Sequence, residues 1–188
     1  MQSKTSFFNR TLFRKNLSRY WPLWGFASFV GFLAPAALLV RVIQSGETSV
    51  APLRVREIYY YLVADAVPIV SIAYAILCAM AVWSYLYNAR SVGMMHSLPI
   101  RREGLFLTNL LSGLAMMAIP YLVAGGLGTL LFACCGGFDA WGTLVTVLAV
   151  IAQSVTFFGL ATFCAFLTGN IFALPALYFL LNFLAPLG

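Results

Sequence analysis

The stretch Leu105–Ala133 reads LFLTNLLSGLAMMAIPYLVAGGLGTLLFA and carries no charged residue over 29 positions. An α-helix rises about 1.5 Å per residue, so about 20 apolar residues cross the roughly 30 Å hydrocarbon core of a bilayer. The stretch is therefore predicted to be a membrane-spanning helix. Because it is longer than one straight crossing needs, we expect tilt or a break near Pro120.

Small residues recur in this stretch with a spacing of four, which places them on one face of a helix. Ala124 and Gly128 form one such pair, and Gly125 and Thr129 form another. Small side chains let neighbouring membrane helices approach closely. We therefore expect helix–helix contacts along this segment.

The rest of the chain repeats the apolar pattern. Of its 188 residues, 62% are hydrophobic and 9% are charged, with a mean hydropathy of +0.93, whereas soluble domains are about 45–50% apolar and about 25% charged. We predict an all-α fold, a polytopic transmembrane helix bundle within residues 20–188, and exclude a soluble enzyme. About five spans are expected, at residues 20–40, 62–85, 105–133, 141–167 and 171–187.

Residues 1–19 carry five basic residues and no acidic residue, with aromatic and aliphatic residues between them. This composition predicts a helix lying in the membrane interface; a frayed cytoplasmic tail is the alternative. With the N-terminus inside, eight Lys and Arg residues are cytoplasmic and three are outside, so we expect a cytoplasmic N-terminus. The chain is still apolar at its last residue, and we expect it to be the N-terminal portion of a longer protein.

The net charge of +6 does not indicate nucleic-acid binding, because the basic residues form three short groups beside apolar spans. Catalytic motifs are also missing from the sequence, including the phosphate-binding GxxxxGK[ST] loop, the GxSxG elbow and HExxH. His96 is the only histidine and lies in a basic segment. The cysteines lack metal-ligand spacing with a nearby histidine, so we expect no metal site; they are Cys78, Cys134, Cys135 and Cys164.

Three polar residues within the predicted spans are candidates for a transport pathway. Asp65 is the only acidic residue in a span, about one turn inside it, where it can also reach water or pair with Arg54 or Arg56. Gln153 and Asn182 lie near the middle of their spans. They are expected either to hydrogen-bond between helices or to line a pathway.

The segment 88–104 lies between two predicted spans, and its first half is amphipathic. At 100° per residue, one side of a helix collects apolar residues and the other collects Arg90, Gly93, His96 and Ser97. Methionine suits adaptable recognition surfaces. The helix is expected either to dock a soluble partner or to rest on anionic headgroups; its apolar side consists of Val92, Met94, Met95 and Leu98.

This segment resembles the cytoplasmic loop of ABC-2-type transporter permeases. Those subunits begin with an interfacial elbow helix and a first hairpin of spans. A segment of the form Arg-x-x-Gly, apolar residues, Leu-Pro-Ile/Val and a basic pair follows. The matching residues here run from Arg90 to Gly93, then through Leu98-Pro99-Ile100 to Arg101-Arg102. The resemblance is clearest over residues 89–113, while the family usually has six spans.

The resemblance implies a permease of the plasma membrane that works as a dimer with a second permease chain. A separate ATPase subunit would bind ATP, and this chain would bind no cofactor and hydrolyse nothing. The cargo implied is an amphiphile such as a peptide, a drug or a lipid-linked molecule. Other possibilities are a secondary transporter fragment, a non-transporting membrane scaffold or assembly protein, and a membrane enzyme. The residues implied in ATPase docking are Arg90, Val92, Met94, Met95, Leu98, Arg101 and Arg102.

Overall fold

The computed structural model describes residues 8–44, 52–87, 102–134 and 140–184. Within these ranges the chain forms six α-helices and one 3₁₀ turn and contains no strand, which confirms the predicted all-α class. The elements are α1 (Arg10–Arg19), α2 (Trp21–Gln44), α3 (Pro52–Trp83) with η1 (Ser84–Tyr87), α5 (Arg102–Cys134), α6 (Ala140–Leu167) and α7 (Ala173–Leu184).

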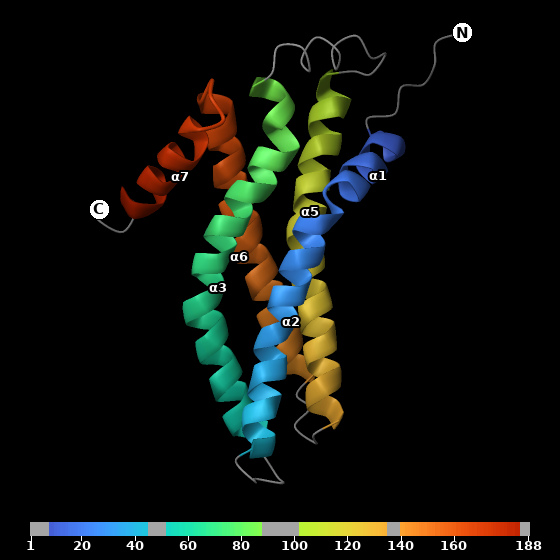
Figure 1. Cartoon of the computed structure of the whole chain (residues 1–188), viewed down its shortest axis with the longest axis vertical. Coiled ribbons are helices and arrows are strands. Elements are labelled where there is room, and N and C mark those ends of the chain that lie inside the picture. Colours follow the sequence, from blue (N-terminus) through green and yellow to red (C-terminus); the bar gives the residue numbers. More distant parts are fainter. Residues whose placement is uncertain (1–7, 45–51, 88–101, 135–139, 185–188) are drawn as a thin grey trace.

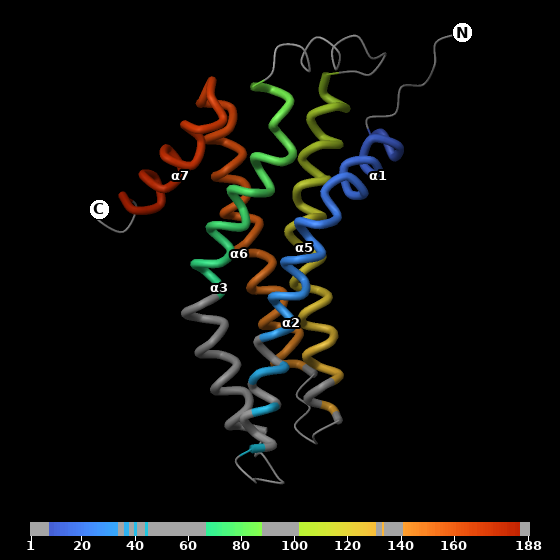
Figure 2. The backbone as a smooth tube through the Cα atoms, viewed as in Figure 1, coloured from blue at the N-terminus to red at the C-terminus, as the bar shows by residue number. Residues whose placement is uncertain are grey.

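The four long helices lie side by side and run along the longest axis of the molecule (Figure 1). Helix α2 contacts mainly α5, and α6 contacts both α3 and α5. The tube in Figure 2 shows α1 inclined against the upper part of α5 and α7 sloping away from the other side of the bundle. Three parts of the long helices have the length and apolar composition needed to cross a membrane: Val67–Tyr87, Arg102–Leu130 and Trp141–Leu167.

The predicted spans at residues 105–133 and 141–167 agree closely with α5 and α6, whereas two other features of the helices differ from expectation. Of the tilt or break expected near Pro120, the break does not occur, because helix α5 continues without interruption through this residue. Membrane helices tolerate an internal proline when neighbouring groups satisfy the freed backbone. Helix α7 has 12 residues, and at about 1.5 Å per residue that length is shorter than a membrane crossing.

The start of α7 is set two residues later than the predicted span by a turn at Asn170. The backbone N–H of Phe172 donates to Asn170 Oδ1 at 3.0 Å, and the N–H of Ala173 donates to the Asn170 carbonyl at 3.1 Å. Asparagine stabilises such turns by bonding to the backbone two residues ahead. The helix can therefore begin only after this turn.

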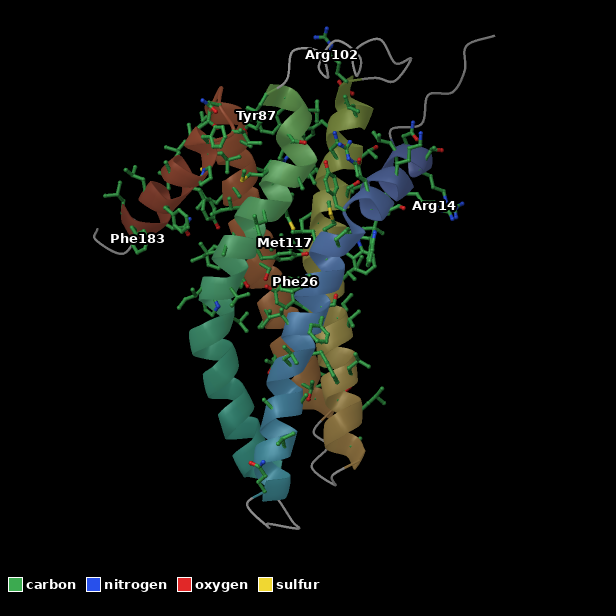
Figure 3. All side chains as sticks on the ribbon, viewed as in Figure 1. Arg14, Phe26, Tyr87, Arg102, Met117 and Phe183 are labelled. Atoms are coloured by element: carbon green, nitrogen blue, oxygen red, sulfur yellow. The ribbon has the colours of Figure 1, made fainter. Side chains whose placement is uncertain are left out.

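The buried core joins the helices at the end of the bundle that carries α1 and α7. Its largest fully buried side chains include Trp83, Phe158, Met117 and Tyr178, and Figure 3 shows Met117 between the helices. The outer surface is apolar too, with Phe26 70% exposed and Trp141 75% exposed. Soluble proteins rarely expose apolar surface on this scale, whereas lipid-facing helices do.

Close contacts between helices depend on small residues, as the spacing in Leu105–Ala133 predicts. A Cβ atom added to Gly31 of α2 would lie 3.1 Å from the Cβ of Ala124 in α5. On another side of α5, a Cβ at Gly125 would overlap Val147 of α6, and a Cβ at Gly113 would overlap the Phe158 ring. Glycine at these positions lets the helices approach closely.

Candidate functional site

The two helix ends that segment 88–101 connects lie at the same end of the bundle, and the start of α5 lies beside α1 (Figure 1). Arg102 is the first residue of α5, is exposed, and lies at the tip of that helix in Figure 3. The other six predicted docking residues lie outside the described residues: Arg90, Val92, Met94, Met95, Leu98 and Arg101. The described surroundings of this segment therefore form the candidate site.

Helix α1 is attached to α5 by a row of hydrogen bonds, here called the polar seam. The Asn9 backbone N–H donates to Thr108 Oγ1 at 3.1 Å. Asn16 Nδ2 donates to Asn109 Oδ1 at 2.7 Å and reaches Ser112 Oγ at 3.4 Å. The seam therefore consists of Asn9 and Asn16 on one side and Thr108, Asn109 and Ser112 on the other.

The direction of these bonds follows from how α5 uses its hydroxyl protons. Thr108 Oγ1 donates to the Gly104 carbonyl at 2.6 Å, and Ser112 Oγ donates to the Thr108 carbonyl at 2.7 Å. Each hydroxyl oxygen keeps lone pairs that can accept a bond. Donors on α1 supply those bonds, so polar groups buried on α5 are paired through α1.

The structure gives one buried side-chain nitrogen of the seam no hydrogen-bond partner among the described residues. The Asn109 side chain is 2% exposed, and its Nδ2 forms no hydrogen bond with the described residues. Among the described residues, its Oδ1 accepts a hydrogen bond from Asn16. A buried amide without hydrogen bonds lowers the stability of the fold. The Asn16–Asn109 bond satisfies the oxygen of this amide but not its nitrogen, and it forms only while α1 is in place.

The sequence sets up the seam through helical spacing. Asn9 caps α1, with Oδ1 accepting from the N–H groups of Thr11 and Leu12 at 3.1 Å each. Asn9 and Asn16 are seven residues apart, which is two helical turns, so they share a face. Thr108, Asn109 and Ser112 have the i, i+1, i+4 spacing that also gathers side chains on one face.

Sequence reasoning missed all five seam residues. The sequence does contain a hint of the seam. Thr108, Asn109 and Ser112 lie close together near the start of the predicted span at 105–133, and the basic N-terminal segment 1–19 has two asparagines two helical turns apart. That combination indicates a polar contact between the two segments. The mean hydropathy of the stretch does not reveal this contact, because Thr108, Asn109 and Ser112 are a small part of a long apolar segment.

An aromatic cluster secures the end of α3 where segment 88–101 begins. The Trp83 ring stacks on Phe106 of α5 with centroids 5.4 Å apart, and it meets Phe166 of α6 edge-on at 4.8 Å. The Tyr87 hydroxyl of η1 donates to the Ala165 carbonyl at 2.9 Å. Together these contacts hold η1 and the ends of α5 and α6 in a fixed arrangement.

A second polar contact, also missed from the sequence, joins three helices farther along the bundle. Ser71 Oγ of α3 lies 2.6 Å from the Tyr121 hydroxyl of α5 and 3.3 Å from Ser154 Oγ of α6. Ser154 Oγ donates to the Val150 carbonyl at 2.7 Å, so its oxygen accepts from Ser71. The three helices are thus linked by directional bonds as well as by packing.

Of the three predicted pathway residues, the structure describes the side chains of Gln153 and Asn182. The side chain of Asp65 lies outside the described part, while Gln153 is half-buried on α6. Asn182 Nδ2 donates to the Tyr178 carbonyl of its own helix at 2.9 Å, so this bond does not link helices.

Metal ligation and thiol chemistry have no support in the described residues. Cys78 and Cys164 are free and buried. No group of three or more His, Cys, Asp or Glu residues able to hold a metal ion occurs in the ranges that the structure describes.

Compared with protein-family models, curated proteins and solved structures, the chain matches none.

Proposed function

We propose that the chain is the transmembrane permease subunit of an ABC-2-type transporter. It moves an amphiphilic substrate, such as a peptide, a drug or a lipid-linked molecule, across the plasma membrane, and a separate ATPase subunit supplies the energy. The observation that carries the proposal is the segment from Arg90 to Arg102, with its glycine, its Leu-Pro-Ile turn and its basic pair.

The arrangement of the helices supports the topology that this proposal needs. Helix α1, the end of η1, the start of α5 and the end of α6 lie at one end of the bundle (Figure 1). The N-terminal segment and segment 88–101 therefore attach to the same end, as the positive-inside count requires for two cytoplasmic segments. In this proposal α2, α3, α5 and α6 cross the membrane and α1 lies at the interface. Helix α7 alone is shorter than a crossing, so the proposed fifth span is the longer stretch of residues 171–187 that contains it.

The proposed mechanism begins with the ATPase holding segment 88–104. Val92, Met94, Met95 and Leu98 fill an apolar groove on the ATPase, and Arg90, Arg101 and Arg102 orient the complex electrostatically. Nucleotide-driven closure of two ATPase subunits pushes this segment. Because segment 88–104 continues directly into α5, the push acts first on that helix.

Helix α5 is suited to passing on such a displacement because it contacts each of the other long helices. It packs on α2, α3 and α6, and the polar seam ties it to α1. Packed side chains and hydrogen bonds resist gradual deformation, so a shift of α5 repacks its neighbours. A second permease chain completes the pathway, and this chain performs no hydrolysis.

The proposal is tested by placing charge on the apolar side of segment 88–104. Met94→Asp combined with Leu98→Asp should abolish co-purification of the ATPase, because carboxylates cannot enter an apolar groove without a partner. His96→Asp combined with Ser97→Asp adds two acidic side chains to the other side and is the matched control. It should retain the complex.

A normal yield of complex from the Met94 and Leu98 variant would defeat the docking proposal. Membrane insertion, measured by extraction and monodispersity, should be the same for both variants because the changes lie outside the predicted spans. A chain that inserts normally but never binds an ATPase would instead be a scaffold or a secondary transporter fragment.

A further inference from the structure

The outer face of α1 is a continuous basic surface. At 100° per residue, the exposed residues of this helix fill one half of its circumference and the residues that contact the bundle fill the other half. The exposed half holds Arg10, Arg14, Lys15 and Arg19, with Thr11 and Ser18 between them. Figure 3 shows Arg14 projecting away from the bundle.

The basic face is not neutralised by this chain within the described residues. The first acidic residue in the sequence is Glu47. Glu103 is exposed at the start of α5, yet no ion pair joins it to α1 in the part that the structure describes. Arg10 and Arg14 are four residues apart, as are Lys15 and Arg19, and like charges at this spacing repel each other. An external anion would relieve that repulsion.

The polar seam fixes which way this face points. Asn16 bonds to Asn109 from one side of α1, so the basic half must face away from α5. An amphipathic helix that lies freely in an interface can roll until its apolar face enters the lipid. Here the apolar half of α1, including Leu17, packs against the protein core instead.

The neighbouring surface indicates a lipid rather than a soluble protein as the source of the anion. Trp21 follows Arg19 by two residues and is 63% exposed, and Phe26 and Phe29 continue an exposed apolar surface along α2. Exposed tryptophan beside basic residues is the arrangement found at the boundary between hydrocarbon and headgroups. Arg19 also lies over the Tyr20 ring, 5.6 Å from its centroid, at the same boundary.

We infer that the outer face of α1 binds the headgroups of anionic phospholipids. The Arg10, Arg14 and Lys15 side chains contact the lipid phosphates and concentrate anionic lipid around the start of α2. Because α1 is tied to α5, lipid bound there is coupled to the helix that leaves segment 88–101. The inference requires a membrane-inserted chain and does not depend on which soluble partner the chain has.

The test uses the full chain in phosphatidylcholine nanodiscs that contain a small fraction of brominated lipid. Bromine on the acyl chain quenches a tryptophan that it touches, and the signal of Trp21 is isolated by subtracting a Trp21→Phe sample. Quenching by brominated phosphatidylglycerol is compared with quenching by brominated phosphatidylcholine at the same fraction. The wild-type protein should favour phosphatidylglycerol, and added salt should reduce the preference.

Variants separate charge from structure. A triple variant that carries Gln at Arg10, Arg14 and Lys15 should lose the preference for phosphatidylglycerol. Each charge removed should lower the relative affinity for that lipid by about fivefold. The charge-preserving set Arg10→Lys, Arg14→Lys and Lys15→Arg should retain it. Ser18→Lys adds a charge to the same face and should raise the preference about fivefold, which keeps the test valid if the triple Gln variant does not fold.

Three outcomes would overturn the inference. They are equal quenching by the two lipids in the wild-type protein, an undiminished preference in the folded triple Gln variant, and no gain from Ser18→Lys. Equal quenching accompanied by normal ATPase binding would overturn the lipid inference while the permease proposal stands.

Discussion

Removing the Asn16 side chain should loosen α1 from the bundle without disturbing the spans. In Asn16→Ala, Asn109 loses the 2.7 Å bond to its Oδ1, and its buried Nδ2 already lacks a partner among the described residues. A buried amide left unpaired costs about 1–3 kcal/mol. The substitution also stabilises α1 by roughly 0.5–0.7 kcal/mol, because alanine has a higher helix propensity than asparagine. The net cost for docking α1 is therefore about 0.3–2.5 kcal/mol.

This cost should appear as faster tryptic cleavage between Arg14 and Lys15 in mild detergent. Cleavage inside a helix requires local opening, and its rate follows the population of the open form. A change of about 0.3–2.5 kcal/mol raises that population roughly twofold to seventyfold. Ser18→Ala is the matched control, because it raises helix propensity on the exposed face without touching the seam, and cleavage should slow slightly.

The reasoning is refuted if Asn16→Ala and Ser18→Ala are cleaved at the same rate, because the seam would then contribute nothing to holding α1. Adding Asn109→Ala to Asn16→Ala removes the unpaired amide that the first change leaves behind. The two changes should therefore be non-additive, by about 1 kcal/mol. Additive effects would mean that the two side chains do not interact.

Two further predictions concern packing in the bundle. Gly113→Ala places a methyl group against the Phe158 ring and should lower the thermal midpoint, at a cost of about 1–3 kcal/mol. A Cβ at Gly126 meets no described atom within 4 Å, so Gly126→Ala should not lower the midpoint; equal midpoints would contradict the close α5–α6 contact. Cys78 and Cys164 are buried, so a maleimide should label them slowly in mild detergent and rapidly after denaturation in sodium dodecyl sulfate; equally rapid labelling in both would show that the core is open.

Hydropathy predicts the helices that depend on apolar length alone. The predicted spans at residues 105–133 and 141–167 closely match α5 (Arg102–Cys134) and α6 (Ala140–Leu167). The predicted span at residues 62–85 is close to the apolar part Val67–Tyr87, but the helix is longer than the span. Helix α3 begins at Pro52 and includes the charged residues Arg54, Arg56 and Glu57. Charge limits how deep a residue can lie in lipid but does not end a helix.

Side-chain pairing is harder to predict than helices, since it depends on which faces meet. The spacing of Asn9 and Asn16 shows that they share a face, but only the packed structure shows that this face meets Thr108 and Asn109. Asn182 shows the opposite case. Its side chain could have bonded to another helix, but its Nδ2 donates to the Tyr178 carbonyl of its own helix. Sequence alone gives the donors and acceptors, while tertiary contacts select the pairs.

The permease proposal is tested most directly by affinity purification of the tagged chain from native membranes in mild detergent, followed by mass spectrometry of the proteins that co-elute. The proposal predicts one P-loop ATPase subunit for each copy of this chain. A folded, monodisperse chain that elutes without any such ATPase would contradict it.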